Sequence, residues 1–314
     1  MIEIVFLGTS ASAPSVRRGL AAAVVMHQER RFLVDCGEGT QRQLLKSGLG
    51  FKRLHTVLLT HGHLDHILGL AGLISTFARW EAIDFIEIHG GEWALERVRG
   101  LMEVVFGTGE PKYDLDYRAV QAGPFLDSQD LHVSAFPVSH RGPGCFGYLF
   151  EETPRRPFLV ERAKALGVPC GPERGALVRG ESVSLPDGRA VAPEEVLGPV
   201  RAGTRVAYVG DTRNARALEQ HVRRVDALVI ESTYLAVESD LARRFGHITA
   251  ADAAQLARDA RVGQLILTHV SRRYNEGEVL AEATAIFPAT SVAKDFDHYR
   301  IIAGERAVPV PVDG

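Results

Sequence analysis

The chain contains the run His61-Gly-His63-Leu-Asp65-His66, in which four residues of metal-binding type fall within six positions. The run follows the apolar, strand-like segment 56–60 and precedes a segment whose apolar residues recur at helical spacing. Imidazole and carboxylate are good zinc ligands, and four of them so close together cannot easily all point at one ion. A turn between a strand and a helix spreads them, so we expect alternate members to face two adjacent metal sites.

Three further candidate ligands also follow strand-like segments. His140 ends one such segment, Asp211 follows another, and His269 follows a third. In open α/β sheets, ligands gather beyond the carboxyl ends of the strands. Each residue alone would more often be an ordinary surface or core side chain, but together they complete a two-metal centre with one carboxylate available to bridge.

Short apolar segments alternate with helical patterns along the chain, which indicates an α/β fold with mixed sheets. The expected strands are residues 2–7, 22–26, 31–35, 56–60, 85–88, 131–140, 205–210, 227–230 and 265–268. The expected helices are residues 39–47, 67–79, 93–106 and 249–260. The last of these has Thr249 as its N-cap and Asp252 three residues later.

Residues 152–200 break this pattern because they are rich in Gly and Pro and lack a long periodic stretch. We expect an inserted arm with one short helix, residues 158–166, and a small hairpin near Asp187-Gly188. Residues 155–179 hold six basic and two acidic side chains, a local excess of 6 − 2 = 4 positive charges. Charge runs usually serve solubility alone, so from the arm itself a solvated loop and a binding surface are equally good interpretations.

Composition sets the remaining bounds. The 314 residues are 46% hydrophobic and 24% charged with a net charge of −3, which is ordinary for a soluble globular protein. No apolar run approaches the roughly 20 residues that span a bilayer, and the N-terminus has the pattern of a strand instead of a signal peptide. Cys36, Cys145 and Cys170 form no C-x-x-C pair, so we expect neither a disulfide framework nor a thiolate zinc site. These features favour a cytoplasmic enzyme whose metal is held by His and carboxylate.

With these motifs the chain resembles the metallo-β-lactamase superfamily, and within it the ribonuclease Z family of tRNA 3′-processing endonucleases. The resemblance covers about Ile2 to Asp297 and rests on the metal-binding run, Phe6-Leu-Gly-Thr9, Asp35-Cys-Gly-Glu-Gly-Thr40, Gly210-Asp-Thr-Arg213 and Thr268-His-Val-Ser-Arg-Arg-Tyr274. Residues 167–180 resemble the Gly/Pro-rich exosite with which that family grips tRNA. The resemblance implies a four-layer αββα sandwich, one domain over residues 1–314, with a flexible tRNA-binding arm inserted at residues 152–200.

The same resemblance implies roles for individual residues. One zinc would be held by His61, His63 and His140, the other by Asp65, His66 and His269, with Asp211 as the bridge. Asp65 would also act as the base, and His247, tuned by Glu231, would protonate the leaving oxygen. The implied substrate contacts are Ser271, Arg273, Arg18, Gly171 and Pro172. The family's N-terminal P-x-K-x-R loop corresponds to Pro14-Ser-Val-Arg-Arg18, where Val16 replaces the lysine, so preference for or against a CCA tail is left open.

The sequence therefore predicts an endoribonuclease with two Zn²⁺ per subunit that removes 3′ trailers from precursor tRNA, leaving a 3′-hydroxyl and a 5′-phosphate. His and carboxylate sites also accept Mn²⁺ or Fe²⁺, so the metal is not fixed. The resemblance further implies a homodimer in which the arm clamps tRNA across subunits, and we expect no membrane and no DNA partner. Two alternatives stay open: a hydrolase of a small phosphodiester or ester, and a zinc-stabilised RNA-binding scaffold.

Overall fold

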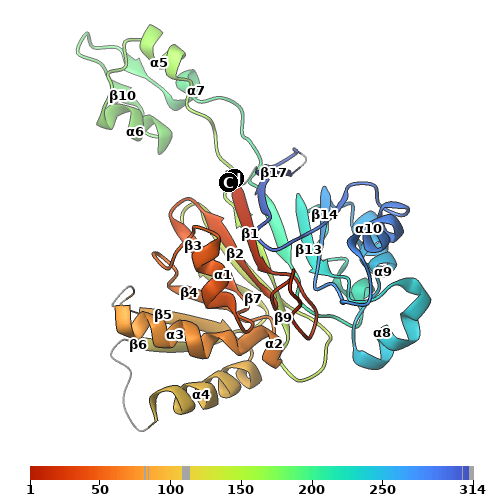
Figure 1. Cartoon of the computed structure of the whole chain (residues 1–314). Coiled ribbons are helices and arrows are strands. Elements are labelled where there is room, and N and C mark those ends of the chain that lie inside the picture. Colours follow the sequence, from red (N-terminus) through yellow and green to blue (C-terminus); the bar gives the residue numbers. More distant parts are fainter. Residues whose placement is uncertain (81–82, 84, 108–113, 306, 311–314) are drawn as a thin grey trace. The chain divides into compact units, whose positions relative to one another are not determined.

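A computed structural model describes residues 1–80, 83, 85–107, 114–305 and 307–310 (Figure 1). The chain divides into two compact units. The larger comprises Met1–Glu151 and Thr204–Gly314, and the smaller comprises Glu152–Gly203. Each unit has its own hydrophobic core, so each is described separately.

Two large sheets form the centre of the larger unit. Within the described residues, one has eight strands in the order β17-β16-β1-β2-β3-β4-β5-β6, and the other has seven in the order β15-β14-β13-β12-β9-β8-β7. The first sheet contains β1 (Ile2–Gly8), β2 (Ala22–His27), β3 (Arg30–Val34), β4 (Thr56–Leu58), β5 (Phe85–Gly90), β6 (Asp114–Ala119), β16 (His298–Ile301) and β17 (Val308–Val310). The second contains β7 (Gly123–Asp127), β8 (Leu131–Pro137), β9 (Phe146–Glu152), β12 (Arg205–Tyr208), β13 (Ala227–Glu231), β14 (Gln264–Thr268) and β15 (Thr290–Val292).

Helices cover the outer face of each sheet (Figure 1). Against the first sheet lie α1 (Thr40–Lys46), α3 (Gly69–Trp80) and α4 (Glu92–Phe106), with the short α2 (Leu64–Ile67) before α3. Against the second lie α9 (Ala250–Asp259) and α10 (Glu276–Thr284), accompanied by α8 (Ser239–Phe245) and the 3-10 turns η1 (Ala215–Leu218) and η2 (Ala236–Glu238).

Alternation along the strands explains the layers. In β1, Ile4 and Phe6 belong to the core between the sheets, whereas Val5 and Leu7 pack toward the helices. Because side chains point to opposite faces with a period of two, a strand that is apolar on both faces must be covered on both faces. The expected αββα sandwich is therefore confirmed.

Most expected elements are found, with differences at their ends. Helix α9 begins at N-cap Thr249, whose hydroxyl accepts from Asp252 N at 3.1 Å while Asp252 in turn caps Thr249 N, as the sequence predicts. The expected helix over residues 67–79 is instead two helices, α2 and α3, and α2 starts inside the metal-binding run. The expected strand over residues 131–140 ends at Pro137, since the chain turns back there and Val138 N donates to Cys145 O. This leaves His140 on a loop.

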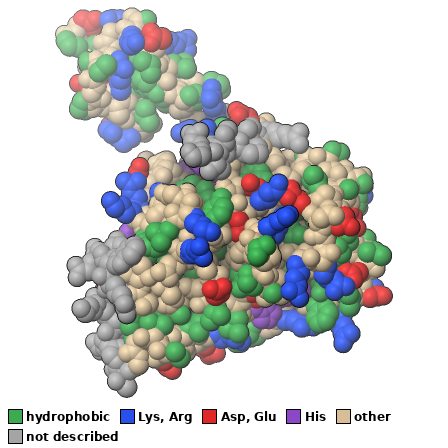
Figure 2. All heavy atoms as spheres, viewed as in Figure 1, with side chains coloured by type: hydrophobic (Ala, Val, Ile, Leu, Met, Phe, Trp, Pro, Cys, Tyr) green, Lys and Arg blue, Asp and Glu red, His purple; other side chains and the backbone are tan. Residues whose placement is uncertain are grey.

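The smaller unit holds more helix than the sequence suggests. Besides α5 (Val160–Ala165) and the β10–β11 hairpin (Val183–Ser184 and Ala190–Val191), it contains α6 (Pro172–Val178) and α7 (Pro193–Val196), so the expectation of one short helix was wrong. Both additional helices begin with Pro at the first turn, where its missing N–H costs no hydrogen bond. Lys and Arg side chains are visible on this unit in Figure 2.

No helix in the described part of either unit is long and apolar enough to cross a membrane.

Candidate metal centre

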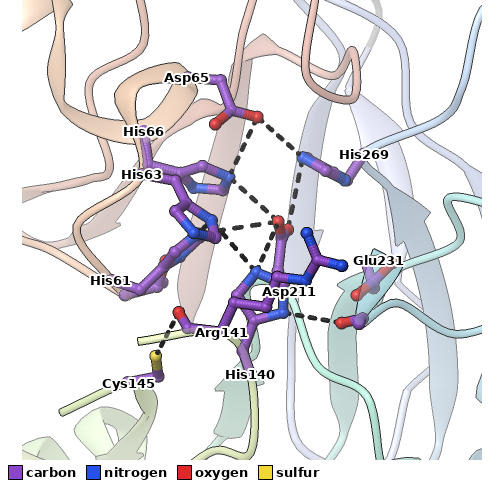
Figure 3. A network of polar contacts seen from close by, with 12 residues as sticks. His61, His63, Asp65, His66, His140, Arg141, Cys145, Asp211, Glu231 and His269 are labelled. Atoms are coloured by element: carbon purple, nitrogen blue, oxygen red, sulfur yellow. Dashed lines mark hydrogen bonds and ion pairs between the residues drawn. The ribbon is translucent and has the colours of Figure 1, made fainter. Parts of the chain in front are cut away.

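The candidate ligands meet at the ends of strands from both sheets. His61 and His63 follow β4, and Asp65 and His66 lie in α2. From the second sheet come three more: His140 on the loop after β8, Asp211 after β12 and His269 directly after β14. Figure 3 shows these seven side chains converging on one place. The structure thus brings together all seven residues that the sequence nominated as metal ligands.

A first ligand group consists of His61, His63, His140 and Asp211, which offer ligand atoms that all lie within 4.8 Å of one another. Nδ1 of His63 lies 2.9 Å from Nε2 of His61 and 3.2 Å from Nε2 of His140. Oδ2 of Asp211 lies 3.7 Å from Nε2 of both His61 and His140. Three imidazoles and one carboxylate oxygen therefore face a common point.

A second ligand group consists of Asp65, His66 and His269. Oδ2 of Asp65 lies 3.8 Å from Nε2 of His66 and 3.5 Å from Nε2 of His269. Asp211 lies beside this group as well, because its Oδ2 is 3.5 Å from His66 Nε2 and its Oδ1 is 3.3 Å from His269 Nε2. Asp211 is thus the one carboxylate of these residues within 4 Å of ligand nitrogens from both groups.

The outer nitrogens of four imidazoles are held by the protein. Nδ1 of His61 lies 3.0 Å from Thr60 Oγ1, and Nδ1 of His66 lies 2.7 Å from Asp35 Oδ2. Nδ1 of His140 donates to Gly246 O at 2.7 Å, and Nδ1 of His269 lies 2.9 Å from Thr233 Oγ1. Such partners fix the orientation of a ring and leave its other nitrogen, here Nε2, for a metal.

Asp35 organises the first-sheet side of the centre, and sequence reasoning did not nominate it. Its Oδ1 accepts from Thr60 N at 2.8 Å, and its Oδ2 accepts from Thr60 Oγ1 at 2.8 Å as well as contacting His66. Asp35 has a positive φ of 58°, a costly conformation for a residue other than Gly. Thr60 packs so closely on Gly210 that a Cβ there would lie 2.6 Å from Thr60 Oγ1, which explains the glycine before Asp211.

Polar atoms in the centre lack partners within the described chain. His66 Nε2, His269 Nε2 and Asp211 Oδ1 are buried and form no hydrogen bond. Buried polar atoms are nearly always satisfied, so these three need a ligand. Neutral imidazole nitrogens and carboxylate oxygens are the donor set that zinc takes in proteins. The cluster is therefore capable of binding metal ions.

The pKa shifts of five of the seven ligands agree with metal binding. Burial, together with the neighbouring histidines, lowers the pKa values of His61 and His140, and lowers that of His63 to about 4. Burial would raise the pKa values of Asp65 and Asp211, but the surrounding imidazoles hold both below their ordinary range. These residues therefore present the neutral imidazole and the ionised carboxylate that a metal requires. At His66, burial lowers the pKa, but the carboxylates of Asp211, Asp35 and Asp65 outweigh it and raise the pKa well above its ordinary value.

His247 lies beside the two ligand groups. Its Nδ1 is 3.1 Å from both carboxylate oxygens of Glu231, which is fully buried and also accepts from Thr212 N at 2.7 Å. Burial lowers the pKa of His247, but the charge and hydrogen bond of Glu231 outweigh it and raise the value to about 9. The geometry leaves one further option, because Asp211, His247 and His269 also form a possible metal-binding group.

A cavity of about 570 Å³ opens onto the centre. Its lining includes the site residues His63, Asp65, Asp211 and His247, and it also includes Ser12, Leu64, Arg97, Arg141, Tyr234 and Phe245. Ser12 N donates to Asp65 Oδ2 at 3.1 Å and so helps to orient that carboxylate. No local sequence pattern points to Arg97, Arg141, Tyr234 or Phe245, because each reaches the cavity only through tertiary packing.

The expected substrate contacts lie outside this lining. Arg273 donates to Glu238 Oε2 at 3.0 Å, and Arg273 N donates to Ser271 Oγ at 3.3 Å. Arg18 uses Nη1 to bond Thr9 Oγ1 and Ala293 O, each at 2.6 Å. Gly171 and Pro172 belong to the smaller unit, where they form the N-cap and first residue of α6. These five residues stay predictions as substrate contacts.

The chain is similar to curated proteins named ribonuclease Z. It is 46% identical to one from Bradyrhizobium diazoefficiens over 95% of this chain and 99% of the relative, and 39% identical to one from Methanothermobacter thermautotrophicus over 94% and 95%. Two family profiles match parts of the chain: "Anti-Pycsar protein Apyc1" at residues 2–84 and "Beta-lactamase superfamily domain" at residues 172–270. Among solved structures, the short form of human tRNase Z has the same fold, with a TM-score of 0.68 at 24% identity over 96% of this chain and 99% of that one.

Proposed function

The chain belongs to the ribonuclease Z family, and on this premise we propose that it is a zinc-dependent endoribonuclease that removes 3′ trailers from precursor tRNA. Hydrolysis leaves a 3′-hydroxyl on the tRNA and a 5′-phosphate on the trailer. The observation that carries the proposal is the position of Asp211, within 4 Å of ligand nitrogens from two groups and beside the His247–Glu231 pair.

The seven ligands suit two metal ions. His61, His63 and His140 would hold one, Asp65, His66 and His269 the other, and Asp211 would bridge them. When bound, two zinc ions activate water at neutral pH and neutralise the charge that develops on the phosphodiester. Mn²⁺ and Fe²⁺ use the same ligand types and are the other candidate metals.

The remaining chemistry belongs to side chains beside the metals. Asp65, oriented by Ser12 N, accepts a proton from the attacking water. His247 acts as the general acid and donates a proton to the 3′-oxygen that leaves with the tRNA. Glu231 supports it by holding Nδ1 of the ring, so that Nε2 is the nitrogen available to the substrate. A base and an acid at separate positions are what phosphodiester hydrolysis requires.

Substrate selection would depend on the smaller unit, which we propose as the tRNA-binding arm. Its α6 carries the Gly171-Pro172 step and Arg174, and its own hydrophobic core supports this helix. We further propose a homodimer in which the arm of one subunit clamps tRNA for the other. A precursor-tRNA substrate also favours a cytoplasmic location.

The test compares two substrates. Metal-loaded protein is incubated with a 3′-extended precursor tRNA and with bis(p-nitrophenyl) phosphate, and both assays are repeated with residues 155–201 replaced by a short Gly-Ser linker. Arg155 and Arg201 pair through their backbones at the base of the unit, so the excision removes the unit at its neck. We expect cleavage after the discriminator nucleotide to collapse while turnover of the small diester persists.

Three other outcomes would contradict parts of this proposal. Turnover of the small diester without cleavage of any precursor tRNA would overturn the proposal and point to a small-diester hydrolase. Binding of tRNA without turnover of either substrate would point to an RNA-binding scaffold. Cleavage of precursor tRNA that survives the excision would overturn the role of the arm.

A further inference from the structure

Two arginines line the cavity beside the metal centre. Arg97 lies in α4 one helical turn after Trp93, and its guanidinium lies 5.3 Å from the centroid of the Trp93 ring. Trp93 in turn meets His63 edge-on, with ring centroids 5.7 Å apart and an interplanar angle of 87°. Arg97 is therefore positioned on the side of the cavity that His63 forms.

Arg141 is positioned on a different side. It follows His140 directly, its guanidinium lies 5.6 Å from the Phe245 ring, and it donates to Arg244 O. His140 Nδ1 bonds Gly246 O in the same segment, so Arg141 is tied to the residues that precede His247. Figure 3 shows Arg141 beside His140 and Asp211.

Neither guanidinium forms an ion pair with a carboxylate of the described residues. Within the described chain, no acidic side chain lies within 4.0 Å of Arg97 or Arg141, unlike Arg99, Arg118 and Arg205. Other arginines without such a partner, such as Arg213, do not line the cavity. The acidic residues of the cavity lining, Asp65 and Asp211, belong to the metal ligand groups. Two unpaired guanidiniums at an open cavity are suited to an anion, and Arg binds phosphate oxygens through two parallel N–H donors.

Aromatic rings accompany both arginines. Phe245, which is 39% exposed, and Tyr234 line the cavity near Arg141, and Trp93 lies under Arg97. Phe245 is the exposed ring, whereas Tyr234 and Trp93 are half-buried. An exposed ring next to a cation is typical of sites for unpaired nucleic acid strands, where bases stack and phosphates pair with Arg. A small diester has only one phosphate, so it cannot place a separate phosphate on each arginine.

We propose that Arg97 and Arg141 bind the two phosphates that flank the scissile one in an unpaired RNA strand. This proposal rests on the proposed function, and the role of His247 decides which arginine binds which phosphate. Because His247 faces the oxygen that leaves with the tRNA, Arg141 on its side holds the phosphate 5′ of the scissile bond. Arg97, on the His63 side, holds the phosphate 3′ of it, in the trailer.

The experiment removes each partner in turn. Arg97→Ala and Arg141→Ala are compared with the wild type and with Arg99→Ala, a matched control in α4 whose side chain pairs with Glu92 and lies over Tyr117. Three precursor tRNAs serve as substrates. One has only natural phosphates, one has an uncharged methylphosphonate in place of the phosphate next to the scissile one on its 5′ side, and one has it on the 3′ side. Bis(p-nitrophenyl) phosphate reports on the metal centre alone.

We expect each cavity variant to lose on the order of 10- to 100-fold in kcat/KM on natural precursor tRNA, the effect of one charged hydrogen-bond partner. Turnover of the small diester and the behaviour of Arg99→Ala should stay within about threefold of the wild type. On the substrate with the 5′ methylphosphonate, Arg141→Ala should have the same kcat/KM as the wild type, because the charge that Arg141 binds is already absent. For the same reason, Arg97→Ala should match the wild type on the substrate with the 3′ methylphosphonate.

Two results would overturn the assignment. One is a variant that loses as much kcat/KM on the matching methylphosphonate substrate as it does on natural precursor tRNA. The other is an equal loss of kcat/KM on the small diester. If the wild type cleaves no precursor tRNA but turns over the small diester, the proposed function fails instead. In that case, the arginine assignment is judged by binding of a short single-stranded oligoribonucleotide. The affinity and salt dependence of wild type and variants are measured by fluorescence anisotropy, and unchanged salt slopes in the variants would refute it.

Discussion

Nδ1 of His247 lies 3.1 Å from each carboxylate oxygen of the buried Glu231. This contact fixes which ring nitrogen faces Glu231 and which faces the cavity. The contact with Glu231 also distinguishes His247 from four of the histidine ligands. The Nδ1 atoms of those ligands contact Thr60, Asp35, Gly246 O and Thr233 instead.

Substituting this pair should lower the rate and leave the metals in place. We expect His247→Ala to reduce single-turnover cleavage about 100- to 10,000-fold, the range for loss of a general acid, and Glu231→Gln to reduce it about 10- to 100-fold. The double variant should be no slower than His247→Ala, because the two residues act as a unit. Metal content measured by mass spectrometry is the control, and loss of metal from His247→Ala would show that the group formed by Asp211, His247 and His269 is a genuine site.

Removal of metal should destabilise the larger unit. Three buried polar atoms of His66, His269 and Asp211 form no hydrogen bond within the described chain and would lose their ligand. A ligand present at about 100 times its Kd stabilises the native state by about 2.7 kcal/mol per site. Calorimetry with and without a chelator measures the change in Tm. Asp211→Asn should already show the lower Tm, since Asp211 serves both groups, and a Tm that is insensitive to chelation would contradict a built metal centre.

Asp35 should set metal affinity without being a ligand. Asp35→Asn removes the charge that holds His66 Nδ1 and disturbs the two bonds to Thr60, so we expect affinity at the second ligand group to fall about 10- to 100-fold. Competition with a chelating dye measures the change. Asp116→Asn, at an exposed carboxylate paired with Arg118, is the control. Equal affinity for Asp35→Asn and this control would exclude the supporting role.

The core of the smaller unit offers a way to disable the proposed arm without excising it. Leu177 is fully buried in that core, and Leu177→Ala should cost about 2–5 kcal/mol in the stability of this unit alone. Activity on precursor tRNA should drop while turnover of bis(p-nitrophenyl) phosphate is unchanged, and hydrogen exchange should localise the loss to residues 152–203. The neighbouring Val178→Ala is the control, because Val178 is 55% exposed. A parallel loss on both substrates would contradict an arm dedicated to tRNA.

The sequence predicts the ligands well because they follow strands. His61, Asp211 and His269 each come directly after or close to the end of a short apolar strand, and the ends of neighbouring strands in these sheets converge. Periodicity also suffices for α9, where Thr249 and Asp252 form a capping box that can be read from the sequence.

Other features depend on tertiary packing that no local pattern encodes. Arg97 and Arg141 are unremarkable in the sequence and meet at one cavity only because α4 and the loop after β8 fold against the same centre. For Arg18, the bonds to Thr9 Oγ1 and Ala293 O are likewise not readable from the sequence, and its contact with substrate stays a prediction. The helix α6 was missed because Gly and Pro suppress helical expectation, although Pro at a first helical position favours helix.

Identification of the product ends tests the central proposal most directly. A 3′-extended precursor tRNA is cleaved by the zinc-loaded protein, and the termini of both products are determined by mass spectrometry. We expect one cut after the discriminator nucleotide, a 3′-hydroxyl on the tRNA and a 5′-phosphate on the trailer, all abolished by a chelator. A 2′,3′-cyclic phosphate, or cleavage that persists without metal, would contradict hydrolysis at this two-metal centre.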